Sequence, residues 1–198
     1  MNGLLKFSSA IDWFTTKIGQ IMWWLTLAMV LIGVENVVAR YAFKQISAIF
    51  GENVARALSN TTYLELQWYL YSLVFLLGAA YVFKSNSHVR VDIIYSNLKP
   101  RAQAMVDIFG ILFLMLPFMI FGIYYSWPSV LKSWQQHEIS SDPGGLARYP
   151  IKTAVIVAFV MLFFQGISEL IKNIAFLRGH TMSNSMHAKT EANNEGAS

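Results

Sequence analysis

Four long apolar stretches follow one another along the chain at near-regular intervals, at residues 18–38, 64–83, 105–125 and 151–174. The hydrocarbon core of a bilayer is about 30 Å thick, and an α-helix needs about 20 residues to cross it. Each stretch has about that length and carries few charged side chains. The pattern therefore predicts an all-α membrane protein with a four-helix transmembrane domain over residues 18–174.

Two shorter segments have an amphipathic pattern. Apolar residues near the N-terminus recur at steps of three and four, which places them on one helix face: Leu4, Phe7, Ile11, Phe14 and Ile18. We expect residues 1–17 to form an interfacial amphipathic helix that leads into the first span, and residues 45–60 to repeat it less clearly. Anchoring at lipid headgroups is the favoured role of both segments, with docking to a partner as the alternative. Residues 175–198 are polar and are predicted to be a disordered tail.

Composition narrows the function classes. Charged residues make up 13% of the chain, which is about half the share in soluble domains. The absence of cysteine excludes disulfides, thiolate metal sites and iron–sulfur clusters. The sequence has no phosphate-binding loop, zinc-protease motif or nucleophile elbow, and the four histidines lie outside the spans. We therefore expect no enzyme activity, no cofactor or metal bound to this chain and no nucleic-acid partner.

The basic residues indicate topology. They are more frequent beside the termini and in the 84–104 loop than in the other two connections, so the positive-inside rule predicts cytoplasmic termini. The six tryptophans mostly fall near span ends, which is typical of an aromatic belt. Pro117 in the third span removes a backbone hydrogen bond and predicts a kink.

Ionisable residues within spans are costly and are functional candidates. Glu35 lies late in the first span, Glu65 opens the second, and Arg40 follows Glu35 by five residues. Because the two spans are antiparallel, we expect these three side chains to cluster near the outer face. A structural ion pair is the favoured interpretation, and a proton or cation site is the alternative. The middle of each span is otherwise apolar, which argues against a solute path through this chain.

The loop after the second span contains an alternating polar pattern. His88, Arg90 and Asp92 alternate with valines and an isoleucine, so that an extended backbone would place them on one face. Tying helices together or binding lipid headgroups is the favoured role, and a metal site from His88 and Asp92 is the alternative.

The run from Gly78 to Asp92 resembles the signature of the small membrane subunit of tripartite ATP-independent periplasmic (TRAP) transporters. Members end the first span with Arg-Tyr-x-Phe, as residues 40–43 do here, and open the second with a glutamate, as at Glu65. Many relatives have a second acidic residue beside that glutamate, whereas Leu66 follows it here. Residues 126–152 are similar to the mannitol/chloroaromatic branch. The resemblance covers about residues 20–175.

The resemblance implies a scaffold subunit that braces a large, elevator-type membrane subunit in the bacterial inner membrane. That large subunit would carry sodium and an organic acid or similar solute, which a periplasmic binding protein delivers. The other implied partners are membrane phospholipids. Candidate subunit-interface or lipid contacts are Arg40, Glu65, His88, Arg90 and Asp92, with Glu35 and Trp68 as secondary candidates.

Two other functions remain open at this stage. One is an autonomous four-helix, proton-coupled transporter that uses Glu35. The other is the membrane anchor of a redox enzyme, against which the lack of histidine within the spans argues.

Overall fold

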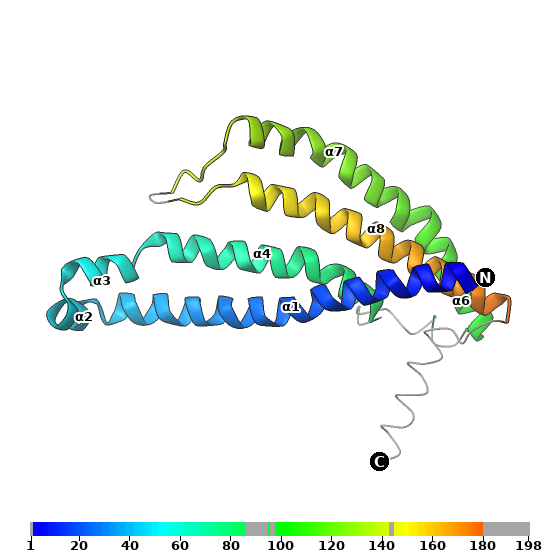
Figure 1. Ribbon diagram of the computed structural model, residues 1–198, viewed down its shortest axis with the longest axis horizontal. Coiled ribbons are helices and arrows are strands. Elements are labelled where there is room, and N and C mark those ends of the chain that lie inside the picture. The colour runs from blue at the N-terminus through cyan, green and yellow to red at the C-terminus, as the bar shows by residue number, and fades with distance from the viewer. Residues whose placement is uncertain (1, 86–94, 96–97, 143–144, 180–198) are drawn as a thin grey trace, which may run out of the picture. The chain divides into compact units, whose positions relative to one another are not determined.

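The computed structural model describes residues 2–85, 95, 98–142 and 145–179. Within these residues the regular elements are helices, as Figure 1 shows. They are α1 (Asn2–Tyr41), α2 (Phe43–Phe50), α3 (Glu52–Leu58), α4 (Thr61–Lys84), α6 (Pro100–Gly110), the π-helix η1 (Ile111–Met115), α7 (Leu116–Gln135) and α8 (Tyr149–Leu177). In the segment that connects α7 to α8, Ile139 and Ala147 form an isolated antiparallel β-bridge.

Four helical stretches are long and apolar enough to cross a membrane: Gly3–Tyr41, Glu52–Lys84, Pro100–Gln135 and Tyr149–Leu177. Each of them contains one of the four predicted spans. The predicted fold class, an all-α membrane protein with four spans, is therefore confirmed.

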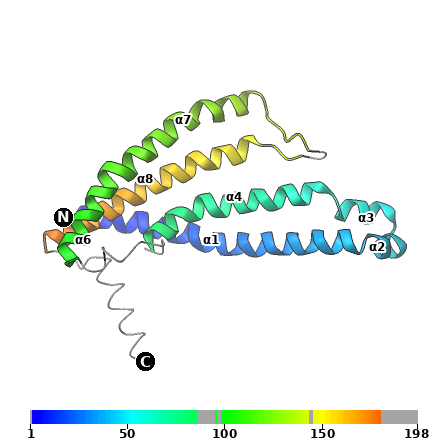
Figure 2. The same ribbon diagram turned by 180° about the vertical axis from the view of Figure 1, so that it is seen from behind.

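The chain forms two compact units. The first contains the described residues of the ranges 1–17, 79–124 and 159–198, and the second those of 18–78 and 125–158. In the second unit α1 and α4 run side by side, joined through α2 and α3 (Figures 1 and 2). A hairpin at residues 138–148 joins α7 to α8 in the same unit.

Local sequence explains several of the helix boundaries. Gly51 has a φ of 89°, which glycine adopts without steric cost, and it separates α2 from α3. The side chain of Asn60 accepts a hydrogen bond from the backbone N–H of Thr62 at 3.2 Å and so caps the start of α4. Pro100 is the first residue of α6, where its missing N–H is not needed. Gly179, with a φ of 75°, follows the end of α8.

The N-terminal segment is continuous with the first span. Helix α1 runs from Asn2 to Tyr41 without a break at residue 17, so the predicted helix over residues 1–17 forms as part of a longer one. Its position at the membrane interface stays a prediction. Helix α8 ends at Leu177, and residues 180–198 lie outside the described residues.

The third span contains a wide turn next to Pro117. The π-helix η1 ends at Met115, and the N–H of Leu116 bonds to the carbonyl of Ile111, five residues back. A proline ring within an α-helix clashes with the carbonyl four residues earlier. A π turn changes the register of the preceding carbonyls, which relieves this conflict. The irregularity that Pro117 predicts therefore takes the form of a π-helical turn.

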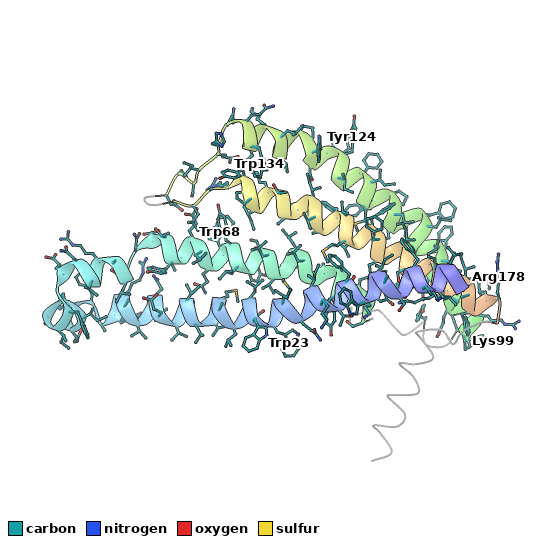
Figure 3. All side chains as sticks on the ribbon, viewed as in Figure 1. Trp23, Trp68, Lys99, Tyr124, Trp134 and Arg178 are labelled. Carbon is teal, nitrogen blue, oxygen red and sulfur yellow. The ribbon has the colours of Figure 1, made fainter. Side chains whose placement is uncertain are left out.

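Apolar side chains cover much of the outer surface. All six tryptophans are between 43% and 76% exposed. In Figure 3 Trp23 and Tyr124, which are 76% and 71% exposed, point away from the helices that carry them. Several of the most deeply buried side chains are polar, among them Gln103, Gln165 and Asn36. Such a distribution suits helices surrounded by lipid, because lipid solvates apolar side chains and does not satisfy polar ones.

Candidate functional site

Each unit encloses a cluster of polar side chains. The N-terminal polar cluster, in the first unit, consists of Ser8, Asp12, Thr15 and Thr16 of α1, Lys84 of α4, and Gln165, Ser168, Glu169 and Lys172 of α8. The hairpin cluster, in the second unit, consists of Glu65 and Tyr69 of α4, Ser133 of α7, Glu138, Ser140, Leu146, Ala147 and Arg148 of the hairpin, and Lys152 of α8.

Asp12 is the centre of the N-terminal polar cluster. Its Oδ2 lies 2.6 Å from Nζ of Lys172. Its Oδ1 accepts hydrogen bonds from Nε2 of Gln165 and from Oγ of Ser168, both at 2.9 Å. One α1 carboxylate thus binds three side chains of α8. Those three lie within two turns of one helix face, because their spacing is three and four residues.

The other polar side chains of the N-terminal polar cluster also have hydrogen-bond or ion-pair partners within it. Ser8 and Ser168 share a bond of 2.7 Å between their hydroxyl oxygens, and the hydroxyl of Thr15 donates to Oε1 of Gln165 at 2.8 Å. Lys172 also pairs with Glu169 at 2.8 Å. None of the buried, unpartnered side-chain atoms in the described part of the chain belongs to the cluster. A satisfied polar network of this kind fixes the register of two helices.

Helix α4 joins the same cluster through its last residue. Nζ of Lys84 donates to the backbone carbonyl of Asp12 at 3.1 Å and to the hydroxyl of Thr16. Three helices are therefore tied together by polar contacts within the first unit.

The sequence alone did not identify this cluster. The amphipathic pattern of residues 1–17 predicts a helix with a polar face but not the partner of that face; in the structure Ser8 and Thr15 are each 2% exposed and bond to residues of α8. The apolar face points outward instead, with Phe7 and Phe14 about half exposed. The available signal was the matching polar spacing in the last span, where Gln165 begins a run of polar positions on one face.

In the hairpin cluster, α4 holds the backbone of the hairpin. Oε2 of Glu65, which is 2% exposed, accepts a hydrogen bond from the N–H of Leu146 at 2.7 Å. The hydroxyl of Tyr69, one turn further along α4, donates to the carbonyl of Ala147 at 3.1 Å. Helical spacing places Glu65 and Tyr69 on the same face, so that both reach one strand of the hairpin.

The other strand is tied to α7 and α8 through Glu138. Its Oε2 accepts a hydrogen bond from Oγ of Ser133 at 2.7 Å and forms an ion pair with Lys152. The hydrogen bond from Lys152, followed by that from Ser133, holds the pKa of the Glu138 carboxyl below its usual value. The hairpin therefore connects the ends of three helices.

Backbone bonds close the hairpin itself. The N–H of Ser140 donates to the carbonyl of Leu146 at 3.0 Å, and the N–H of Arg148 donates to the carbonyl of Glu138 at 2.8 Å. The two strands approach closely near Gly145, where an added Cβ would lie 2.6 Å from Cβ of Ser140. Glycine is therefore required at this position.

The expected Glu35–Arg40–Glu65 cluster is not formed. In the described part of the chain no ion pair joins any two of these residues. Nε of Arg40 donates to Oδ1 of Asn36 at 2.9 Å, and Glu65 binds the hairpin. The Oε1 atoms of Glu35 and Glu65 are both buried without a hydrogen-bond partner.

Helix geometry gives the reason. Gly33 faces Gln67, since a Cβ at Gly33 would lie 2.7 Å from Nε2 of Gln67. Glu35 and Glu65 each lie two residues from this contact, and two residues turn a helix by about 200°. The two glutamates are therefore at the same level but on faces that point away from the contact between α1 and α4.

The predicted roles of the other candidate residues stay predictions. His88, Arg90 and Asp92 lie outside the described residues. Arg40 is exposed, and Trp68 is 43% exposed with its ring centroid 4.4 Å from that of Tyr69. No group of three or more histidine, aspartate or glutamate side chains in the described residues could hold a metal ion.

Comparison with known proteins assigns a family. Residues 29–176 match the family described as tripartite ATP-independent periplasmic transporters, DctQ component. The matched range starts within α1 and therefore leaves out Ser8, Asp12 and Thr15 of the N-terminal polar cluster. It ends at residue 176 and includes the α8 residues of that cluster. No curated protein and no solved structure matches the chain.

Proposed function

Because the chain belongs to the DctQ-component family of tripartite ATP-independent periplasmic transporters, we propose that it is the small scaffold subunit of a sodium-coupled importer. In this proposal a large membrane subunit carries the solute, an organic acid or similar compound, together with sodium. A periplasmic binding protein delivers the solute. The present chain braces the large subunit and does not form the solute path.

One observation carries the scaffold role. Within each cluster the polar side chains bind one another and the backbone. The N-terminal polar cluster joins α1, α4 and α8, and the hairpin cluster joins α4, α7 and α8. Polar groups used in this way fix helix positions, whereas a solute path needs polar groups that can exchange their partners. The exposed surface of the spans is apolar, as a surface that packs on lipid or on another membrane subunit must be.

The orientation and the contact residues follow from the same proposal. Both termini and the 84–104 loop are cytoplasmic in the inner membrane, and the 138–148 hairpin is periplasmic. His88, Arg90 and Asp92 contact the large subunit or lipid phosphates on the cytoplasmic side, and Arg40 does so on the outer side. Glu65 acts indirectly by holding the hairpin, because its side chain is buried in the chain's own contacts.

Sodium-driven uptake in proteoliposomes tests the function. The chain is reconstituted alone, with its large subunit, and with the large subunit and binding protein together; a fourth preparation contains the large subunit and binding protein without this chain. We expect uptake only from the complete set. Uptake by the large subunit and binding protein at the full rate without this chain would overturn the scaffold role.

An Arg90→Ala variant tests the cytoplasmic contact, with Arg56→Ala as a control, because Arg56 forms only an exposed ion pair with Glu52 within α3. We expect the Arg90 variant to reduce co-purification with the large subunit, because arginine binds phosphates and carboxylates through two parallel hydrogen bonds. Unchanged assembly and uptake would remove Arg90 from the interface.

The buried, unpartnered Oε1 of Glu35 favours a second candidate function, an autonomous proton-coupled transporter. In that case the chain alone would transport in proteoliposomes under a proton gradient, and Glu35→Gln would abolish transport. The scaffold proposal predicts no transport by the chain alone and unchanged uptake by the full complex containing Glu35→Gln.

A further inference from the structure

Two charged side chains of the hairpin cluster have buried atoms without partners. Oε1 of Glu65 on α4 is an unpaired acceptor, and Nε of Arg148 at the end of the hairpin is an unpaired donor. The hydrogen-bonding groups inside folded proteins are nearly always paired, so each exception requires an explanation. Here the two unpaired groups have opposite charge and belong to the same unit.

The backbone between them places them within reach. The other oxygen of Glu65 holds the N–H of Leu146 at 2.7 Å, and Arg148 follows Leu146 by two residues. Two residues of extended chain span roughly 7 Å, a distance that the long arginine side chain covers. Tyr69 bonds to the intervening carbonyl of Ala147 at 3.1 Å, so α4 contacts this side of the hairpin at both Leu146 and Ala147.

Among the described residues no carboxylate forms an ion pair with Arg148, although the charge of the arginine helps to hold the pKa of Glu138 below the usual value. Nη2 donates to the neutral hydroxyl of Ser140 at a long 3.3 Å. The carboxylate of Glu138, on the same hairpin, is bonded to Lys152 and Ser133. A buried donor without an acceptor is unfavourable, whereas an arginine–carboxylate pair is among the strongest polar contacts.

We propose that Glu65 and Arg148 form an ion pair in the membrane-embedded protein, and that this pair is a latch that locks the 138–148 hairpin onto α4. The latch requires the two side chains to turn toward each other, and the bonds of Glu65 and Tyr69 to the hairpin backbone already hold Leu146 and Ala147 against α4. It concerns the chain's own fold and does not depend on the scaffold function.

Hydrogen exchange of the hairpin amides in a double-mutant cycle tests the latch. The full chain is reconstituted in lipid nanodiscs as wild type, Glu65→Gln, Arg148→Gln and the double variant. Glutamine at position 65 can still accept the bond from Leu146, so the substitution removes the charge and leaves that contact possible. The readout is the exchange rate of the amides of Ser140, Leu146 and Arg148, which are hydrogen-bonded in the structure.

We expect each single variant to accelerate this exchange at least tenfold, and the double variant to exchange no more than about threefold faster than either single one. Tenfold corresponds to about 1.4 kcal/mol of lost latch energy. The latch proposal would be wrong if the double variant accelerated exchange by the product of the two single accelerations, or if Arg148→Gln left the exchange rate unchanged.

Two controls separate the latch from general loosening. Glu138→Gln removes a carboxylate from the same hairpin, and its coupling to Arg148→Gln should be weaker than that of Glu65→Gln, because Arg148 acts on Glu138 without a direct ion pair. Arg56→Gln breaks an exposed ion pair with Glu52 in the same unit and should leave hairpin exchange unchanged. If Glu138 instead showed the coupling expected of Glu65, Arg148 would pair with the hairpin's own carboxylate and the latch to α4 would be wrong.

Discussion

Lys172 lies between two carboxylates, with Nζ 2.6 Å from Oδ2 of Asp12 on α1 and 2.8 Å from Oε1 of Glu169 on its own helix. The two contacts are not equivalent. The Glu169 contact stays within α8, whereas the Asp12 contact joins α8 to the N-terminal part of α1. The arrangement therefore predicts different results for removing the lysine and for removing either acid.

Lys172→Met should destabilise the protein by about 3 kcal/mol, at the lower end of the range for a broken buried ion pair, because about a fifth of each side chain of the Asp12–Lys172 pair is exposed. It leaves Asp12 and Glu169 close together without the cation that pairs with both carboxylates. Asp12→Asn should cost only about 1 kcal/mol, since Lys172 keeps Glu169. Unfolding in mixed micelles of increasing SDS content, followed by tryptophan fluorescence, measures both values.

Arg56→Gln is the matched control, because it breaks an exposed ion pair whose side chains are 69% and 64% accessible. We expect it to change stability by less than about 0.5 kcal/mol. Equal effects of Lys172→Met and Asp12→Asn would contradict the asymmetric role given to the lysine.

The N-terminal polar cluster shows what sequence patterns leave undetermined. The spacing of Leu4, Phe7 and Phe14 correctly predicts a helix with one apolar face. It does not say which face packs on the protein. In water the apolar face is buried, whereas in a bilayer polar faces can pair with one another and apolar faces meet lipid. The partners of Asp12 lie in the last span, where the polar spacing that begins at Gln165 indicates a polar face but does not identify α1 as the helix that it contacts.

The Glu35–Glu65 expectation failed for a related reason. Antiparallel spans set the level of the two residues, and the contact between Gly33 and Gln67 agrees with that register. The direction of each side chain depends on helix rotation, which the hydrophobic pattern of a membrane helix leaves open because nearly every position is apolar. Glu65 binds the N–H of Leu146 in the hairpin. The sequence of the hairpin has no apolar periodicity from which its fold could be predicted, so this contact could not be predicted either.

Acidic pH should weaken the hairpin through Glu138. Its pKa is held below the usual carboxyl value of 4.5 by the hydrogen bonds from Lys152 and Ser133. A lowered pKa in the folded state contributes stability that is present above the unfolded value and is lost as pH falls through the folded one. We therefore expect the SDS content at which half of the wild type is unfolded to decrease when the pH is lowered below about 4.5.

Glu138→Gln provides the comparison for this pH effect. The variant should be less stable than the wild type at pH 7 and should approach it as the pH falls toward 3. Parallel pH profiles of the two proteins would show that Glu138 is not the titrating group.

Gly122 allows close packing of α7 on α8. An added Cβ would lie 2.7 to 3.0 Å from three ring atoms of Phe159. We expect Gly122→Ala to destabilise the protein by about 1–3 kcal/mol, as overpacking does. The same substitution at Gly110, where nothing lies within 4 Å of an added Cβ, should be neutral or stabilising by up to about 1 kcal/mol. Phe159→Leu should partly rescue Gly122→Ala, and an equal cost at both glycines would contradict the packing argument.

The proposed orientation can be tested directly because the chain has no cysteine of its own. Lys99 in the 84–104 loop and Gln136 just before the hairpin are both exposed. They are separated by the third span, so single cysteines at the two positions must lie on opposite sides of the membrane. With cytoplasmic termini, a membrane-impermeant maleimide added to intact cells should label Gln136→Cys and leave Lys99→Cys unlabelled until the inner membrane is broken.

The labelling experiment also separates orientation from assembly. The excess of basic residues beside the termini predicts the orientation whether or not the large subunit is present, because the positive-inside rule acts during insertion. We therefore expect the same pattern when the chain is expressed alone. Labelling of Lys99→Cys in intact cells would reverse the orientation and place the 138–148 hairpin in the cytoplasm. Labelling of both variants in one preparation would indicate dual insertion, and the positive-inside bias of this chain would then be too weak to fix its topology.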